Sequence, residues 1–205
     1  MSKTVIVGIT GQTGAGKSTL AKILSKSDIP IIDADIEAKE VLKKDKSLIP
    51  LLKQEFGSDI TNSNGILDRK LLASRAFASD ENTKKLNNIM LPSIISDIKN
   101  KIELFRKSKE NIIAIDAPLL FESGLDEVCN IIISVTAGCA TRLDRIIKRD
   151  NITIDLAKKR ISAQKSEKYY KDKSDIILNG GLSLDRFEHE AEKIIYQIRK
   201  KAYSE

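Results

Sequence analysis

Gly11-Gln12-Thr13-Gly14-Ala15-Gly16-Lys17-Ser18-Thr19 is the stretch of sequence that decides the fold. It has the form G-x-x-x-x-G-K-[ST], in which glycines let the backbone turn its N–H groups toward phosphate oxygens. The apolar residues 5–9 precede it as a predicted buried strand, and apolar residues with helical spacing follow it. A strand, a glycine loop and a helix in this order predict an anion site at the amino terminus of the helix.

The residue types of this loop predict nucleotide binding. Lys17 can reach the β- and γ-phosphates, and the Ser18 hydroxyl can coordinate Mg²⁺. The competing interpretation is a chance glycine turn, but four fixed positions match by accident in only roughly 1% of chains of this length. The expected ATP-binding residues are Gly14, Ala15, Gly16, Lys17, Ser18 and Thr19.

The composition is typical of a soluble globular protein. Hydrophobic residues make up 41% and charged residues 31% of a 205-residue chain, enough for one domain with a small insertion. The amino-terminal segment lacks a signal-peptide pattern, and no apolar run approaches membrane-spanning length. Cys129 and Cys139 lack metal-ligand spacing and are expected to be buried or half-buried free thiols. These observations predict a cytoplasmic protein without a membrane partner.

The net charge of the chain indicates which kinds of molecule it binds. Lys and Arg number 35 against 29 Asp and Glu, a net charge of +6 that favours anionic partners. A nucleic-acid-binding module is disfavoured, because aromatic residues are few and basic residues form no clustered stripe. A GTPase is disfavoured because the sequence has no guanine-reading N-K-x-D motif.

Hydrophobic periodicity predicts the arrangement of the other elements. Four more apolar segments are predicted strands: residues 29–33, 111–116, 130–135 and 175–179. Helical patterns cover residues 35–44, 47–56, 68–77, 81–106, 141–148, 156–164 and 184–202. Alternating strands and helices, with strands apolar throughout, predict an α/β fold with a parallel five-stranded sheet and helices on both faces. The ligand is then expected at the carboxyl ends of the strands.

Two regions without predicted strands are candidates for moving parts. Residues 47–107 are predicted as helices broken by Gly57, Gly65 and Pro92, and such an inserted block is expected to cap a ligand. The densely charged residues 165–173 are expected to be a lid hinge or an exposed loop.

Carboxylates follow two of the predicted strands. Phosphoryl transfer to a hydroxyl needs a carboxylate that orients the nucleophile and accepts its proton. Asp33 and Asp35 are equally good candidates by spacing, and Asp35 is alternatively a helix N-cap. Asp116 ends the third strand, as the magnesium-side acid of P-loop proteins does, or caps the loop that follows.

Three arginines in and directly after the predicted helix of residues 141–148 are candidates for contacts with phosphates: Arg142, Arg145 and Arg149. Their guanidinium groups can bind phosphate oxygens from a mobile lid. The alternative is a solvated helix face.

These motifs resemble those of the dephospho-CoA kinase family over nearly the whole chain. Residues 8–19 resemble G-L-T-G-G-I-G-S-G-K-S-T, and residues 32–35 match I-D-A-D. Residues 65–69 resemble G-x-L-D-R, and residues 118–122 match P-L-L-F-E. Residues 160–164 and 175–181 resemble R-I-x-x-Q and A-D-x-V-I-x-N-x-G. The chain departs from the family pattern at Lys39, Leu91, Arg142 and residues 165–173.

The resemblance implies a three-layer P-loop kinase fold in one domain, residues 1–205. It also implies that residues 47–107 form a substrate-binding cap and that approximately residues 142–173 form a lid. The implied activity is ATP- and Mg²⁺-dependent phosphorylation of the ribose 3′-hydroxyl of dephospho-CoA, the last step of coenzyme A synthesis. The alternative is another P-loop kinase that acts on a nucleoside or nucleotide. A monomer or weak homo-oligomer is expected.

The same resemblance implies roles for individual residues. It favours Asp35 over Asp33 as the general base. The implied catalytic residues are Asp35, Lys17, Arg145 and Arg149, and the implied substrate-binding residues are Asp33, Arg69 and Asp116.

Overall fold

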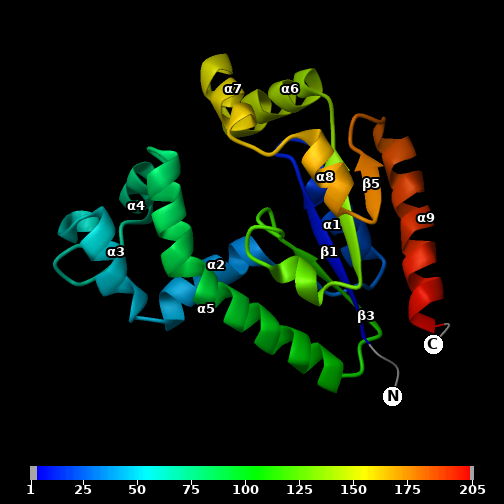
Figure 1. Ribbon diagram of the computed structural model, residues 1–205, viewed down its shortest axis with the longest axis horizontal. Coiled ribbons are helices and arrows are strands. Elements are labelled where there is room, and N and C mark those ends of the chain that lie inside the picture. The colour runs from blue at the N-terminus through cyan, green and yellow to red at the C-terminus, as the bar shows by residue number, and fades with distance from the viewer. Residues whose placement is uncertain (1–3, 204–205) are drawn as a thin grey trace. The chain divides into compact units, whose positions relative to one another are not determined.

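A five-stranded parallel sheet forms the centre of the computed structural model, which describes residues 4–203 (Figure 1). The strands are β1 (Val5–Gly11), β2 (Ile31–Asp33), β3 (Ile112–Asp116), β4 (Ile131–Thr136) and β5 (Ile176–Asn179). They lie in the order β2-β3-β1-β4-β5, so β1 is central and pairs with β3 and β4. The predicted sheet is confirmed.

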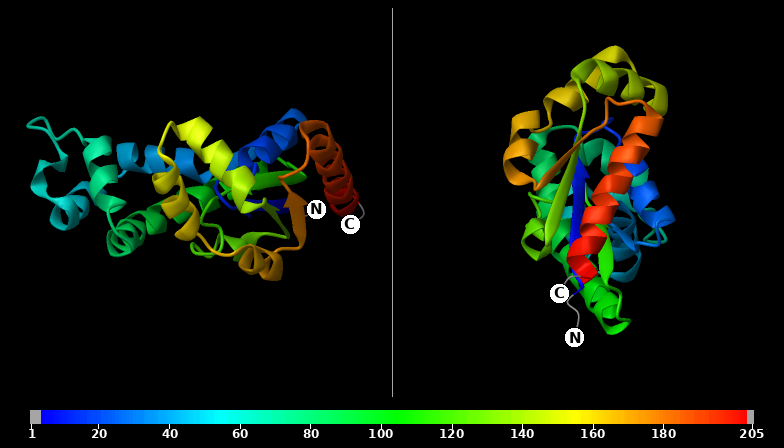
Figure 2. Two further views of the ribbon diagram at one scale, coloured as in Figure 1. Left: turned by 90° about the horizontal axis from the view of Figure 1, so that it is seen from above. Right: turned by 90° about the vertical axis from the view of Figure 1, so that its right-hand side faces the viewer.

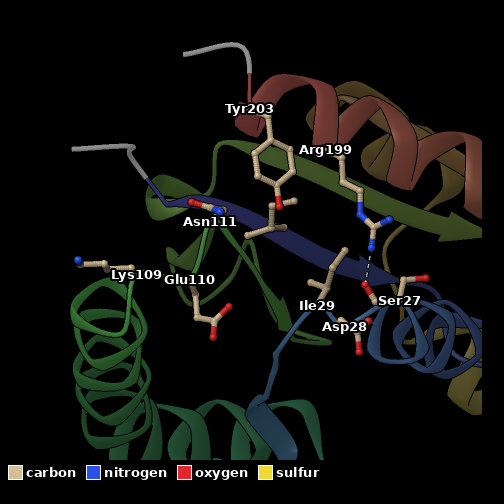
Figure 3. Close-up of a pocket in the computed structure, with 9 residues that line it drawn as sticks. Ser27, Asp28, Ile29, Lys109, Glu110, Asn111, Arg199 and Tyr203 are labelled. Atoms are coloured by element: carbon tan, nitrogen blue, oxygen red, sulfur yellow. Dashed lines mark hydrogen bonds between the residues drawn. The ribbon is translucent and has the colours of Figure 1, made fainter.

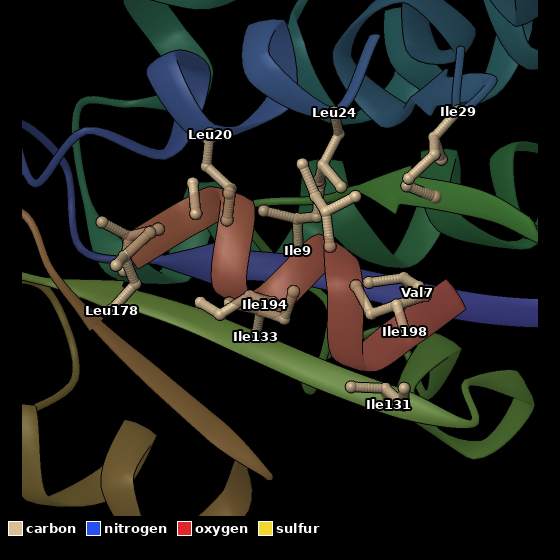
Figure 4. Packing of buried hydrophobic residues seen from close by; sticks show 14 of the residues in the cluster. Val7, Ile9, Leu20, Leu24, Ile29, Ile131, Ile133, Leu178, Ile194 and Ile198 are labelled. Atoms are coloured by element: carbon tan, nitrogen blue, oxygen red, sulfur yellow. The ribbon is translucent and has the colours of Figure 1, made fainter. Parts of the chain in front are cut away.

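One face of the sheet is covered by α1 (Lys17–Lys26) and α9 (Leu184–Tyr203). Figure 2 shows α9, in red, running alongside the strands. Alternate residues of β1, such as Val7 and Ile9, point into this layer and pack with Leu20 and Leu24 of α1 and with Ile198 of α9 (Figure 4). Burying one such aliphatic side chain contributes roughly 1.5–3 kcal/mol to folding. This packing fixes α1, and therefore the loop before it, against the sheet.

The opposite face is covered by shorter segments. The 3₁₀ helix η2 (Leu125–Val128) contacts β1, and α8 (Glu167–Lys173) contacts β4 and β5. Tyr170 of α8 is buried, and the rings of Tyr169 and Phe121 meet edge to face with centroids 5.7 Å apart. Of the two alternatives expected for residues 165–173, the exposed loop is therefore wrong, because residues 167–173 form a helix. Two tyrosines and the Ser166 cap, which accepts from the Tyr169 N–H, make this charged segment a packed helix.

Two further helices, α6 (Cys139–Asp150) and α7 (Ile154–Ser162), pack against each other. Figure 1 shows them beyond the carboxyl ends of the strands. Asn151, between the helices, has a left-handed backbone with φ of +49°, and the Thr153 side chain caps α7 by accepting from Leu156 N–H.

The chain divides into two compact units, of which one contains the residues up to 34 and from 101 onward and therefore holds the sheet. The other unit, residues 35–100, is helical. Its elements are α2 (Ala34–Lys44), α3 (Leu48–Phe56), η1 (Ser58–Ile60), α4 (Arg69–Ala76) and α5 (Asp80–Lys107), the first and last of which extend into the sheet unit. Within it, Arg75 joins Asp59 in an ion pair and donates to the Phe56 carbonyl oxygen, so α4 is tied to the end of α3.

Helix α5 differs from its prediction at Pro92. The sequence predicts a break there, but the helix continues through Pro92 for 28 residues in all. Proline removes one backbone hydrogen bond from a helix. The residues at four-residue spacing around it, Met90, Ile94 and Ile98, are all buried, and their packing outweighs that local cost. Among the helices formed by residues 4–203, none has the length and apolar character needed to cross a membrane.

Candidate functional site

The glycine loop joins the carboxyl end of β1 directly to α1, as the sequence predicts. Gly11 has a φ of +143°, and a Cβ there would lie 2.2 Å from the Val135 carbonyl oxygen, so only glycine fits. Gly16 precedes α1 and has no side chain that could cap its first turn. The first N–H groups of α1 and the helix dipole therefore favour an anion at the loop.

Lys17, the first residue of α1, forms a hydrogen-bonded ion pair with the Asp116 carboxylate. Asp116 is only 5% exposed and ends β3, in register with Ile9 of β1 and Asp33 of β2. A buried carboxylate is costly without a partner of opposite charge, and Lys17 supplies one. The structure thus brings Lys17, Asp116 and Asp33 to the carboxyl edge of the sheet.

Asp33 and Asp35 lie on different elements. Asp33 ends β2, and α2 begins at Ala34, so Asp35 lies in the first helical turn. The chain is therefore helical rather than extended from Ala34 onward. The helix dipole favours an acidic side chain in the first turn, and Asp35 lies inside the helix rather than at the N-cap that precedes it.

The three arginines of α6 have three different environments. Arg145 Nη1 lies 3.3 Å from the Gly14 carbonyl oxygen and 3.2 Å from that of Ala15, so this side chain contacts the glycine loop. Arg149 is more exposed and pairs with Asp150 at 2.7 Å. Its hydrogen bond is the main cause that lowers the pKa of the Asp150 carboxyl from its usual value.

Arg142 is not part of a solvated helix face. It is 4% exposed, and its Nε donates to the Thr13 carbonyl oxygen at 3.0 Å. Its Nη2 donates to the side chain of Gln164 at 2.7 Å. Burial lowers the pKa of this guanidinium from its usual value. No spacing pattern singles out Gln164, and its only signal is the resemblance of residues 160–164 to R-I-x-x-Q.

Gly180 is a second residue that spacing alone did not single out. It follows β5, and its N–H donates to the Thr136 carbonyl oxygen at 2.8 Å. A Cβ on Gly180 would lie 1.7 Å from the Ala15 carbonyl oxygen. The chain after β5 therefore passes directly against the backbone of the glycine loop, where any side chain would collide with it.

Arg69 belongs to the helical unit. It is the first residue of α4, and its Nη2 donates to the Lys39 carbonyl oxygen at 3.3 Å. The preceding Asp68 caps α4 by accepting from the N–H groups of Lys70 and Leu71. This cap fixes the position of Arg69 at the amino terminus of its helix.

The oxygen donors near the glycine loop suit a hard divalent cation. Mg²⁺ takes oxygen ligands and is commonly held by one or two carboxylates together with substrate phosphates. Ser18 supplies a hydroxyl from the first turn of α1, and Asp116 supplies a carboxylate. Among residues 4–203 no cluster of three or more His, Cys, Asp or Glu forms an all-protein metal site. The donor set therefore fits Mg²⁺ bound together with a phosphate ligand.

A hollow of about 300 Å³ lies at the other end of the sheet (Figure 3). Its lining includes Asp28, Glu110, Lys109, Arg199 and Tyr203, and Arg199 donates to the Ser27 carbonyl oxygen at 2.7 Å. It borders the amino end of β3, whereas ligands of parallel α/β sheets bind at the carboxyl ends. This hollow is therefore separate from the candidate site.

Comparisons with known proteins bear on the family and the fold of this chain. Residues 5–185 match the family model described as dephospho-CoA kinase. A dephospho-CoA kinase of Fusobacterium nucleatum is 38% identical over 181 residues, which cover 88% of this chain and 92% of that protein. The crystal structure of TT1252 from Thermus thermophilus has a TM-score of 0.77 at 25% identity and covers 95% of this chain and 97% of its own. The fold is also that of a dephospho-CoA kinase from Campylobacter jejuni, with a TM-score of 0.63 at 24% identity over 94% of this chain and 96% of that one.

Proposed function

Because this chain belongs to the dephospho-CoA kinase family, we propose that it transfers the γ-phosphoryl group of ATP to the ribose 3′-hydroxyl of dephospho-CoA, giving coenzyme A and ADP. The observation that carries the proposal is the meeting of Lys17 with Asp116 at the sheet edge, in a chain whose family match spans residues 5–185. Phosphoryl transfer depends mainly on positioning and on electrostatic stabilisation, and this edge offers both.

ATP binds with its phosphates on residues 14–19. Lys17 moves from Asp116 to the β- and γ-phosphates, where its charge opposes the negative charge that develops during transfer. Ser18 would hold Mg²⁺ bound together with ATP, and this ion would neutralise phosphate charge. The support for these roles is the start of α1 at Lys17 and the burial of Asp116 beside it.

Asp35 is the general base. It accepts the proton of the 3′-hydroxyl while that oxygen bonds to phosphorus, and the bond from phosphorus to the ADP oxygen breaks. Its place in the first turn of α2, directly after the end of β2, supports this role. Asp33 and Asp116 orient the acceptor, and the shared register of these two residues at the ends of β2 and β3 supports their acting together.

Three arginines outside the glycine loop bind the two substrates. Arg145 and Arg149 bind the transferring phosphoryl group from a lid of approximately residues 142–173, and the contacts of Arg145 with the glycine loop support this. Arg69 binds dephospho-CoA from a cap of residues 47–107, supported by the resemblance of residues 65–69 to G-x-L-D-R. The enzyme acts in the cytoplasm as a monomer or weak homo-oligomer, and its two free cysteines suit a reducing compartment.

An ADP-release assay with three acceptors tests the substrate. Dephospho-CoA, adenosine and AMP are offered separately at equal concentration with Mg²⁺ and millimolar ATP. We expect ADP release well above the acceptor-free rate with dephospho-CoA alone. Faster release with adenosine or AMP would instead identify a nucleoside or nucleotide kinase and overturn the proposal.

A further inference from the structure

We propose that Arg142 and Gln164 are positioning residues that hold the first turn of the glycine loop in its nucleotide-binding shape. The function proposed above gives neither residue a role. The inference depends on that function only in taking the nucleotide as the ligand of the loop.

Two hydrogen bonds meet at one atom of Gln164. Its Oε1 accepts from the Thr13 backbone N–H at 2.9 Å and from Arg142 Nη2 at 2.7 Å. Arg142 Nε donates to the Thr13 carbonyl oxygen at 3.0 Å, which closes the ring of three residues. The peptide units before and after Thr13 are thus each held by a side chain from outside the loop. Rotation about either backbone dihedral of Thr13 would break one of these bonds.

Arginine side chains of α6 also hold the loop residues that follow Thr13. The carbonyl oxygens of Thr13, Gly14 and Ala15 all accept from arginines of α6, the first from Arg142 and the other two from Arg145. In a trans peptide the N–H group points away from the carbonyl oxygen of the same unit. Fastening the carbonyls of residues 13 and 15 to α6 therefore directs the N–H groups of Gly14 and Gly16 to the opposite side, where a loop of this kind cradles phosphate.

A third contact ties the loop to the segment that carries Gln164. Gln12 is 5% exposed, and its Nε2 donates to the Lys165 carbonyl oxygen at 3.4 Å. Gln12 and Thr13 therefore bind the successive residues 164 and 165. The junction between α7 and α8 and the first turn of the loop are held together at two adjacent positions, which fixes the acceptor atom of Gln164 in place.

Because Arg142 is buried, the hydrogen-bonded ring of Arg142, Thr13 and Gln164 is favourable only when all of its bonds are made. A guanidinium out of water is costly unless its donors are bonded, and Arg142 finds its acceptors in Thr13 and Gln164. Loss of either partner leaves a buried polar group unsatisfied, so the ring is stable when complete and costly when incomplete. The loop thereby has its binding shape before the nucleotide arrives, which saves the free energy of ordering it on binding.

The test compares Gln164→Leu with Gln164→Glu. Leucine removes the acceptor atom, whereas glutamate keeps it at the same distance from the backbone. Gln197→Leu is the matched control, because Gln197 is exposed on α9. The readouts are the Kd of MgADP by calorimetry, hydrogen exchange of the Thr13 amide without nucleotide, and the melting temperature.

We expect Gln164→Leu to raise the MgADP Kd by roughly tenfold and to accelerate Thr13 exchange, because two hydrogen bonds are lost. Gln164→Glu should keep the Thr13 amide protected, and Gln197→Leu should resemble the wild type in both. If Gln164→Leu lowers only the melting temperature, while MgADP affinity and Thr13 exchange stay unchanged, the role is structural and the proposal is overturned.

A double-mutant cycle tests whether the two residues act as one unit. Arg142→Gln and Gln164→Leu combined should weaken MgADP binding by clearly less than the product of the single effects, because either change breaks the same ring. Multiplicative effects would contradict the ring. A wild type that binds MgADP but does not phosphorylate dephospho-CoA would overturn the proposed function alone, since none of these readouts uses the acceptor.

Discussion

At the scale of single residues, two aspartates two positions apart have different settings. Asp33 ends a strand and lies in register with Asp116, whereas Asp35 is inside the first turn of α2. Spacing alone left them as equal candidates for the base, because it did not tell where the strand ends. The helix start at Ala34 gives them different settings: Asp33 ends a strand of the sheet, and Asp35 belongs to the helical unit.

Asp35→Asn is expected to lower kcat by roughly 10²–10⁴, because an amide keeps the shape but cannot accept the hydroxyl proton. MgADP affinity and melting temperature should remain close to those of the wild type. Asp33→Asn in the same assay is the control and should affect the KM for dephospho-CoA more than kcat. A large kcat loss in Asp33→Asn with none in Asp35→Asn would reverse the assignment.

The two cysteines should differ in reactivity. The sequence predicts buried or half-buried thiols, but Cys139 is exposed while Cys129 is half-buried. Burial raises the pKa of the Cys129 thiol to about 12, with Asp126 and Asp175 adding to the shift. Since only the thiolate reacts, this shift makes Cys129 far less reactive at pH 8 than an ordinary thiol. Iodoacetamide at pH 8 should label Cys139 in the native protein and both cysteines in guanidinium, as read by peptide mass. Equal labelling of both in the native protein would contradict this burial.

At the scale of elements, α6 presents Arg149 near its carboxyl end. Arg149→Ala should lower kcat by roughly 10²-fold while changing MgATP affinity little, because a lid contact forms mainly in the closed state. Lys148→Ala is the matched control, since Lys148 is a neighbouring exposed cation that pairs with Asp144. A loss of affinity at unchanged turnover would assign Arg149 to ground-state binding. A variant indistinguishable from the wild type would leave it on a solvated face.

The turn after β5 brings Gly180 against the backbone of the glycine loop, and a substitution there tests this close approach. Gly180→Ala should weaken MgADP binding and destabilise the fold by roughly 1–3 kcal/mol, because the added Cβ would collide with the Ala15 backbone. Gly138→Ala is the control, since a Cβ there meets no heavy atom of residues 4–203 within 4 Å. Binding by calorimetry and the melting temperature are the measurements. Wild-type values for Gly180→Ala would show that this close approach does not shape the loop.

Hydrophobic periodicity predicted some elements correctly and others incorrectly. Apolar runs predicted the strands well, because strands buried on both faces need apolar residues throughout. Residues 165–173 carry too many charges for such a pattern, and their helix depends on the packing of two tyrosines against Phe121. Pro92 is a predicted helix breaker, but α5 continues past it because the residues around it are buried and packed. In both cases tertiary contacts overrode the local signal.

At the scale of the whole molecule, sequence patterns predict the kinds of element but not which strands are neighbours. β2 follows α1 in the chain but pairs with β3, which comes after α5. The glycine loop, Asp33, Asp35 and Asp116 were found because short motifs carry their chemistry. The contacts of Thr13 with Arg142 and Gln164 span 129 and 151 residues, and no local spacing could predict them.

The position of the new phosphate distinguishes transfer to the ribose 3′-hydroxyl from transfer to any other group. Dephospho-CoA and its 3′-deoxy analogue are each incubated with the enzyme, Mg²⁺ and ATP, and the products are analysed by mass spectrometry and ³¹P NMR against authentic coenzyme A. We expect one added phosphate on dephospho-CoA, identical to that of coenzyme A, and no transfer to the 3′-deoxy analogue. Phosphorylation of the analogue, or a product with the phosphate at another hydroxyl, would contradict it.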